Sequence, residues 1–94
     1  MATIQITAAG DGTFHVEVRD GAVTTSHTVT VPPGLGADLG WAPGREEALV
    51  GRSFRFLLER EPATSILPRF SLEVIGQYFP EYRGEMRTGA DDAD

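Results

Sequence analysis

Apolar and polar residues alternate along residues 3–31 of the sequence. This period of two is typical of β-strands that bury one face and leave the other in water. Two glycine-containing turns divide the segment, so we expect three antiparallel strands connected as a meander. The face expected to be buried carries Ile4, Ile6, Ala8, Phe14, Val16, Val18, Val23, Thr25, His27, Val29 and Val31.

The two turns set the expected register of the strands. Asp20-Gly21 predicts a type I′ hairpin turn, because both central residues of that turn need a positive φ, and it would place Val16 opposite Thr25. Gly10-Asp11-Gly12 predicts a three-residue loop that places Val16 opposite Ile6. A two-residue loop there would turn the apolar residues of the first strand away from the core, so we prefer the three-residue loop.

Two helices are expected after the strands. Pro32-Pro33 ends the third strand, and a helix is expected from about Pro43 to Arg60 after a loop rich in Gly and Pro. Its apolar arc spans roughly 200°, which is wider than the usual apolar stripe. A second helix is expected to open at Ser71 as N-cap and to end before Pro80. Its expected buried residues are Leu72, Ile75, Tyr78 and Phe79.

These elements predict an α+β fold in which both helices pack on one face of the sheet. Residues 83–94 contain no large apolar residue except Met86, and they end in four residues of which three are Asp. A segment with so little apolar surface is expected to be a disordered acidic tail. The sequence therefore predicts a single domain over residues 1–82 and a tail over residues 83–94.

Composition narrows the class of protein. The chain of 94 residues has a formal net charge of -6, which disfavours binding to nucleic acid. It has no cysteine, which excludes disulfides and thiolate metal sites and suits a reducing cytoplasm. No apolar run has the length of a membrane span, and all 8 basic residues are Arg, as in a high-GC bacterial genome. We expect a cytoplasmic bacterial protein that binds no cofactor, metal, membrane or nucleic acid.

Several segments carry a family resemblance. Residues 53–62, 65–67, 70–75 and 78–82 resemble an uncharacterised family of small bacterial proteins with the pattern SFxFLLERE, SIL, FxLxVI and YFPEY. The similarity covers most of residues 14–82 and supports the single domain. It implies no activity, cofactor or catalytic residue.

The two histidines are candidate site residues. His27 falls on the face expected to be buried, either as a pH-sensitive imidazole or as a hydrogen-bonded side chain at the rim of the core. On the opposite face, His15 is expected opposite Ser26 and near Glu17, a set that invites a hydrolase interpretation. A flat exposed sheet offers no oxyanion hole, so ordinary cross-strand polar pairs are the preferred interpretation.

The long helix offers a candidate interaction surface. Arg45, Arg52 and Arg55 form a basic stripe on its polar side. The stripe is either a docking face for an acidic partner or a solvated face with an Arg55–Glu59 pair. Trp41 lies in the preceding loop, where it either contacts a partner or folds back over the core.

No motif of a known chemistry occurs in the sequence. We therefore expect a non-catalytic protein-interaction or regulatory domain that binds a protein partner or forms a homodimer. The homodimer would use either the surplus apolar arc of the long helix or a free edge of the sheet, since the first and third strands would both be edges. The alternative is a small enzyme or ligand-binding protein with its site between helix and sheet near His27.

Overall fold

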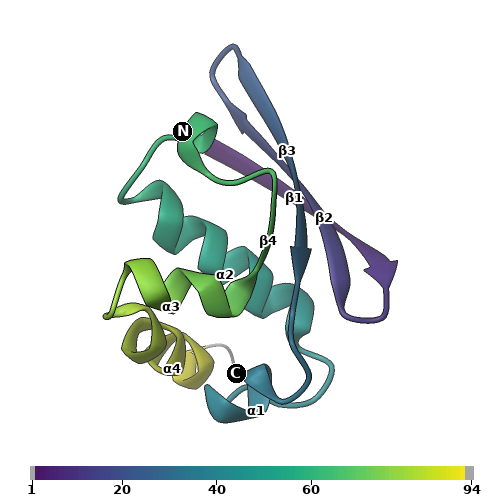
Figure 1. The fold of residues 1–94 in the computed structure, drawn as a ribbon, viewed down its shortest axis with the longest axis vertical. Coiled ribbons are helices and arrows are strands. Elements are labelled where there is room, and N and C mark those ends of the chain that lie inside the picture. The colour runs from purple at the N-terminus through teal and green to yellow at the C-terminus, as the bar shows by residue number, and fades with distance from the viewer. Residues whose placement is uncertain (1, 93–94) are drawn as a thin grey trace.

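The computed structural model describes residues 2–92, with side chains from residue 3 to residue 87. It is an α+β structure with one sheet and several helices (Figure 1). In chain order the elements are β1 Ala2–Gly10, β2 Thr13–Asp20, β3 Val23–Thr30, α1 Leu35–Asp38, α2 Glu46–Leu58, the 3-10 turn η1 Ala63–Ser65, β4 Arg69–Ser71, the 3-10 turn η2 Leu72–Val74, α3 Ile75–Tyr78 and α4 Tyr82–Asp92.

The antiparallel meander β1-β2-β3 is present, and the pairing of β1 with β2 is as expected. Ile6 lies opposite Val16, and Ala8 lies opposite Phe14. The connection differs from the expected three-residue loop, because Gly10 pairs with Thr13 and a β-bulge lies between Ala8 and Gly10. The two residues that turn, Asp11 and Gly12, have φ of 49° and 76°, as a type I′ turn requires. The bulge inserts one residue and so keeps Ile4 and Ile6 on the face that packs against the core, whereas Ala8, also expected there, is exposed.

The register between β2 and β3 differs from the prediction by two residues. Val16 lies opposite His27 rather than Thr25, and Asp20 pairs with Val23. The turn is Gly21-Ala22, and only Gly21 has a positive φ there, at 65°, which is the pattern of a type II′ turn. A shift of two residues preserves the faces of the strands. It also moves Val23 to the hairpin tip, where it is 46% exposed instead of buried.

A fourth strand, absent from the prediction, covers part of β3. β4 pairs in parallel with β3, with Val29 opposite Phe70, so the sheet is mixed and has the order β1-β2-β3-β4. The backbone N–H of Thr28 also donates to the carbonyl of Pro68, at 2.8 Å. The third strand is therefore not a sheet edge along this stretch, and β1 is the remaining long edge.

The helix α2 fills the centre of the molecule. One side packs on β1, where Gly51 allows close approach: a Cβ built at this position would lie 3.2 Å from the Cδ1 of Ile6. The other side meets the C-terminal helices, since the Phe56 ring lies 5.8 Å from Phe79 and 5.4 Å from Tyr82 between ring centroids. In Figure 1 the helix α2 lies between the sheet, which is on one side of it, and the helices α3 and α4, which are on the other side. The apolar arc of α2 is thus covered within the chain.

The expectation of two helices is incomplete. Ser71 ends β4 and precedes a 3-10 turn rather than opening a regular helix, and its hydroxyl makes no capping bond. The α-helix that follows is only Ile75–Tyr78. Tyr78, expected to be buried, is 70% exposed.

Where we expected a disordered tail, the structure has the helix α4. Tyr82 and Met86 are one helical turn apart on α4, and both are buried, at 1% and 0% exposure. The Trp41 indole N–H donates to the Met86 carbonyl at 2.9 Å. Two buried side chains and one buried hydrogen bond hold the first half of this otherwise polar helix. Residues 93–94 of the expected tail lie outside the described residues.

Candidate functional site

The imidazole of His27 is part of the core. It is 4% exposed, and its ring lies 5.3 Å from that of Phe54. Nδ1 lies 2.8 Å from the carbonyl oxygen of Leu67, and Nε2 lies 2.9 Å from the Thr25 hydroxyl. A carbonyl can only accept, so Nδ1 carries the proton and Nε2 can accept from Thr25. Both ring nitrogens are thus occupied, and His27 ties β3 to the segment that enters β4.

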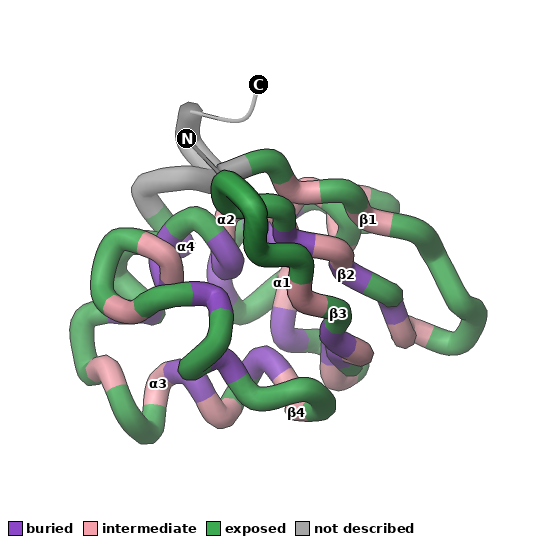
Figure 2. Tube along the Cα trace, turned by 90° about the horizontal axis from the view of Figure 1, so that it is seen from above, coloured by how far each residue is buried: buried purple, intermediate pink, exposed green. Residues whose placement is uncertain are grey.

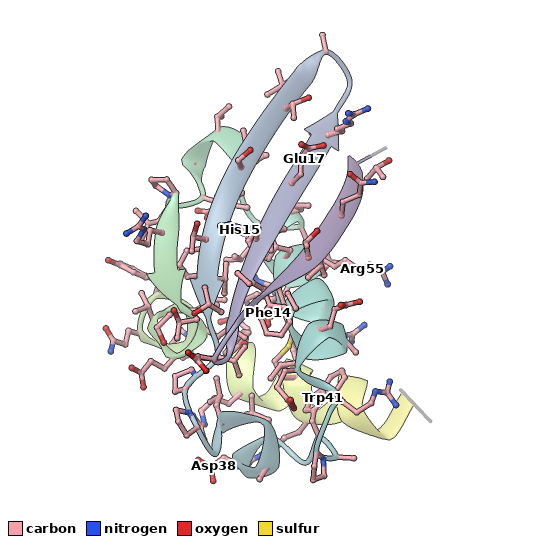
Figure 3. The ribbon with its side chains drawn as sticks, turned by 90° about the vertical axis from the view of Figure 1, so that its right-hand side faces the viewer. Phe14, His15, Glu17, Asp38, Trp41 and Arg55 are labelled. Atoms are coloured by element: carbon pink, nitrogen blue, oxygen red, sulfur yellow. The ribbon has the colours of Figure 1, made fainter. Side chains whose placement is uncertain are left out.

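The exposed sheet face holds His15 and Glu17, which project from β2 on the outer side of the sheet (Figure 3). His15 lies opposite Thr28, with Nδ1 3.3 Å from the Thr28 hydroxyl, and not opposite Ser26 as expected. Ser26 lies opposite Glu17, which accepts a hydrogen bond from Arg19 at 3.2 Å. No Ser–His pair forms on the described part of this face, so the arrangement does not support a hydrolase.

The predicted arginine stripe is only partly exposed. Arg55 projects into solvent beside β1, whereas Arg45 and Arg52 are half-buried (Figure 3). The expected Arg55–Glu59 pair is replaced, because the Glu59 carboxylate lies 3.5 Å from Arg60. Of the three arginines of the predicted stripe, Arg55 alone is exposed.

Trp41, the fourth predicted interaction residue, points inward. Its side chain is 6% exposed, and its indole N–H is used by the Met86 carbonyl. The loop therefore folds back over the core, which was the second of the two interpretations given for Trp41. In this position the indole holds α4 and offers no surface to a partner.

Sequence reasoning missed a cluster around Arg60. Its guanidinium lies 3.6 Å from the centroid of the Phe56 ring and donates to Glu81 at 3.2 Å. Backbone hydrogen bonding, followed by the hydrogen bond from Arg60, lowers the pKa of Glu81. The cluster ties the end of α2 to the start of α4. The two charged residues are 21 positions apart, so no local pattern links them.

The outer edge of β1 is the first candidate site. Among residues 2–92, β2 is the only strand that pairs with β1. In Figure 2, β1 is coloured exposed and intermediate along its length, while buried residues lie on β2 and the helices. Ile4 and Leu58 are half-buried and line a hollow of about 510 Å³ next to this edge. An unpaired strand of this kind presents free backbone donors and acceptors.

A small cavity beside the C-terminal end of α2 is the second candidate site. Its volume is about 220 Å³. Leu67 and Tyr78, at 49% and 70% exposure, lie at its mouth. Glu61 is the only acidic or basic residue that lines it. Its apolar wall consists of Leu57, Ile66, Phe70, Val74, Ile75 and Phe79.

Two further classes of site, a metal centre and a membrane-spanning helix, are absent from the described residues. His, Asp and Glu side chains do not gather there in a group of three that could hold a metal ion. Likewise, none of the described helices combines the length and the apolar character needed to cross a membrane.

Comparison of the chain with protein-family models, with curated proteins and with solved structures finds no match. The family resemblance inferred from the sequence pattern therefore stays a prediction.

Proposed function

We propose that this chain is a non-catalytic protein-interaction domain that pairs through the free edge of β1, and that its partner is a second copy of the chain. The observation that carries the proposal is the outer edge of the nine-residue strand Ala2–Gly10, which pairs with no strand other than β2 among residues 2–92. Such an edge is a template for another strand unless the sequence blocks it.

The sequence of β1 contains none of the usual blocking features. It has no lysine, no proline and no charged side chain. The bulge next to Gly10 lies at the end of the strand, which leaves the regular stretch before it available for pairing. β3 differs, because β4 and the preceding segment already cover part of its outer edge.

The alternation along β1 is self-complementary. In an antiparallel pair of β1 strands centred on Gln5, Ile4 of one copy would lie opposite Ile6 of the other, and Thr3 would lie opposite Thr7. The half-buried isoleucines would then meet on the side of the helices, where they also approach the hollow beside Leu58. Like charges would not meet within the paired strands, because β1 carries no charge.

The helix surface, the other surface considered for a dimer, is less suitable. The apolar arc of α2 is covered by β1 on one side and by Phe79 and Tyr82 on the other. We therefore assign self-association to the free edge of β1. His27, proposed as an alternative ligand site, has both ring nitrogens bonded within the chain, so we assign it no catalytic role.

Sedimentation equilibrium of the purified chain tests this function. The mass of the wild type should rise toward that of a dimer between micromolar and millimolar concentrations. Gln5→Lys should remain monomeric over that range, because two lysines would face each other at the centre of the pair. His15→Lys adds the same charge on β2, one strand in from the edge, and should associate like the wild type. A wild type that stays monomeric throughout the range would overturn the proposal.

A further inference from the structure

We infer that the cavity beside the C-terminal end of α2 is a binding site for a small amphipathic cation, an amine attached to one or two fused rings. This inference does not depend on the pairing of β1, because none of the residues that line the cavity belongs to β1, although Glu61 also lines the hollow beside that strand. The two proposals can therefore fail separately.

The size of the cavity limits the ligand. Its volume of about 220 Å³ is below the range of about 300–1,000 Å³ that is usual for drug-sized ligands. A buried apolar cavity of about 150 Å³ is sufficient for benzene. The site therefore fits a single ring or a fused pair of rings and excludes nucleotides and oligosaccharides.

The lining determines the character of the ring. Leu57, Ile66 and Ile75 are buried at the base, while Phe70 and Phe79 are half-buried in the wall. None of these five side chains can hydrogen-bond, and the uncharged part of the lining adds only the hydroxyls of Ser65 and Tyr78, so a polar ring packed among them would lose most of its bonds to water. An apolar or aromatic ring would instead remove apolar wall surface from water.

The mouth gives a second indication of a ligand. The described side chains include three large apolar residues that are well exposed, and two of them, Leu67 and Tyr78, stand at this opening. Exposed apolar residues that gather at one opening mark a binding surface more often than scattered ones do.

The charge at the mouth selects a cation. Glu61 is the only acidic or basic residue of the lining, and among the described side chains its carboxylate has no ion-pair partner. Arg60, its neighbour in sequence, is engaged by Glu59 and Glu81. Glu61 also follows the last turn of α2, where its N–H donates to the Leu57 carbonyl at 2.8 Å. The negative end of the helix dipole adds to the attraction for a cation.

Titration of the isotope-labelled full chain by NMR tests the site, with tryptamine and indole-3-acetate as matched probes. Both carry an indole ring, but the first is a cation and the second an anion. Tryptamine should bind saturably and shift the amides of Leu67, Phe70 and Tyr78. It should bind about tenfold more tightly than indole-3-acetate, because the Glu61 carboxylate attracts the amine of tryptamine and repels the carboxylate of indole-3-acetate.

Glu61→Gln keeps the shape of the side chain and should weaken tryptamine about threefold to fivefold, as expected for a partly exposed pair. Glu73→Gln is the matched control, because Glu73 is exposed and does not line the cavity. The comparison of the two probes uses only the wild type and so does not depend on either variant folding. Absence of saturation by tryptamine, equal affinity for the two probes, or amide shifts centred elsewhere would overturn the inference.

Discussion

The hydroxyl oxygens of Ser53 and Tyr82 lie 2.7 Å apart in the interior of the protein, 29 residues apart in sequence. Both side chains are buried, and the Ser53 hydroxyl also donates to the Leu49 carbonyl at 2.8 Å. Because the single hydroxyl proton of Ser53 is donated to Leu49, the Tyr82 hydroxyl is the donor in its hydrogen bond with Ser53. This bond fixes α4 to the centre of α2.

Tyr82→Phe should destabilise the fold by about 1 kcal/mol, because it removes one buried hydrogen bond and leaves Ser53 its bond to Leu49.

Burial raises the pKa of Tyr82 from 10.0 to about 12, against the lowering effects of the Ser53 hydrogen bond and of Arg83. The folded state thus keeps a proton that the unfolded state loses. Wild-type stability should fall as the pH rises from 10.0 toward about 12. When urea unfolding is measured across this pH window, the stability of Tyr82→Phe should fall less steeply than that of the wild type.

Met86→Ala should cost about 2–5 kcal/mol, since the side chain is fully buried between α4 and α2. For a small domain this is a large share of the total stability. Glu85→Gln, at an exposed position next to it, should change stability by no more than about 0.5 kcal/mol. Thermal melts of both variants would show whether α4 is part of the cooperative fold. Equal melting temperatures would mean that it is not.

His27→Phe should lower stability by about 1–3 kcal/mol. The ring volume is nearly kept, but the Leu67 carbonyl loses its donor and the Thr25 hydroxyl loses a partner. His15→Gln on the exposed face should be close to neutral, within about 0.5 kcal/mol. Chemical denaturation of both variants provides the measurement, and a similar small loss in both would contradict the role assigned to His27.

Gly12→Ala should be more destabilising than Gly10→Ala. Both glycines have a positive φ, of 76° and 97°, so alanine is strained at either position. Only at Gly12 would the added Cβ also approach the Val31 carbonyl oxygen, to 3.0 Å. The difference in free energy of unfolding isolates this contact. If the two variants unfold alike, the close approach of the turn to the end of the meander is not rigid.

The strands β1, β2 and β3 and the helix α2 were predictable because each has a long, regular apolar period. The faces of β2 and β3 were also right, although their register was displaced by two residues, because Asp20-Gly21 and Gly21-Ala22 both fit a hairpin turn. Such a shift leaves the alternation intact and changes only which residues are neighbours.

The short and polar elements were not predictable. β4 has three residues, too few for an alternation to appear. In α4 the only signal was Tyr82 with Met86 one turn later, in a segment otherwise polar enough to suggest disorder. The candidate site depended on these elements, because β4 decides which sheet edge is free and η2 with α3 forms part of the cavity. The hydrogen bonds of Trp41 to Met86 and of His27 to Leu67 join residues 45 and 40 positions apart, so no local pattern in the sequence could predict them.

The pairing of two β1 strands is tested most directly by a single cysteine at Gln5. The chain has no cysteine of its own, so each cross-link is assigned without ambiguity. In a pair centred on Gln5 the two Cα atoms would lie about 4.5–5.5 Å apart, within the range that a disulfide spans. Gln5→Cys should therefore oxidise rapidly and almost completely to a covalent dimer, while Ser26→Cys, exposed on the same face of β3, should not. Equal rates for the two variants would contradict the proposed interface.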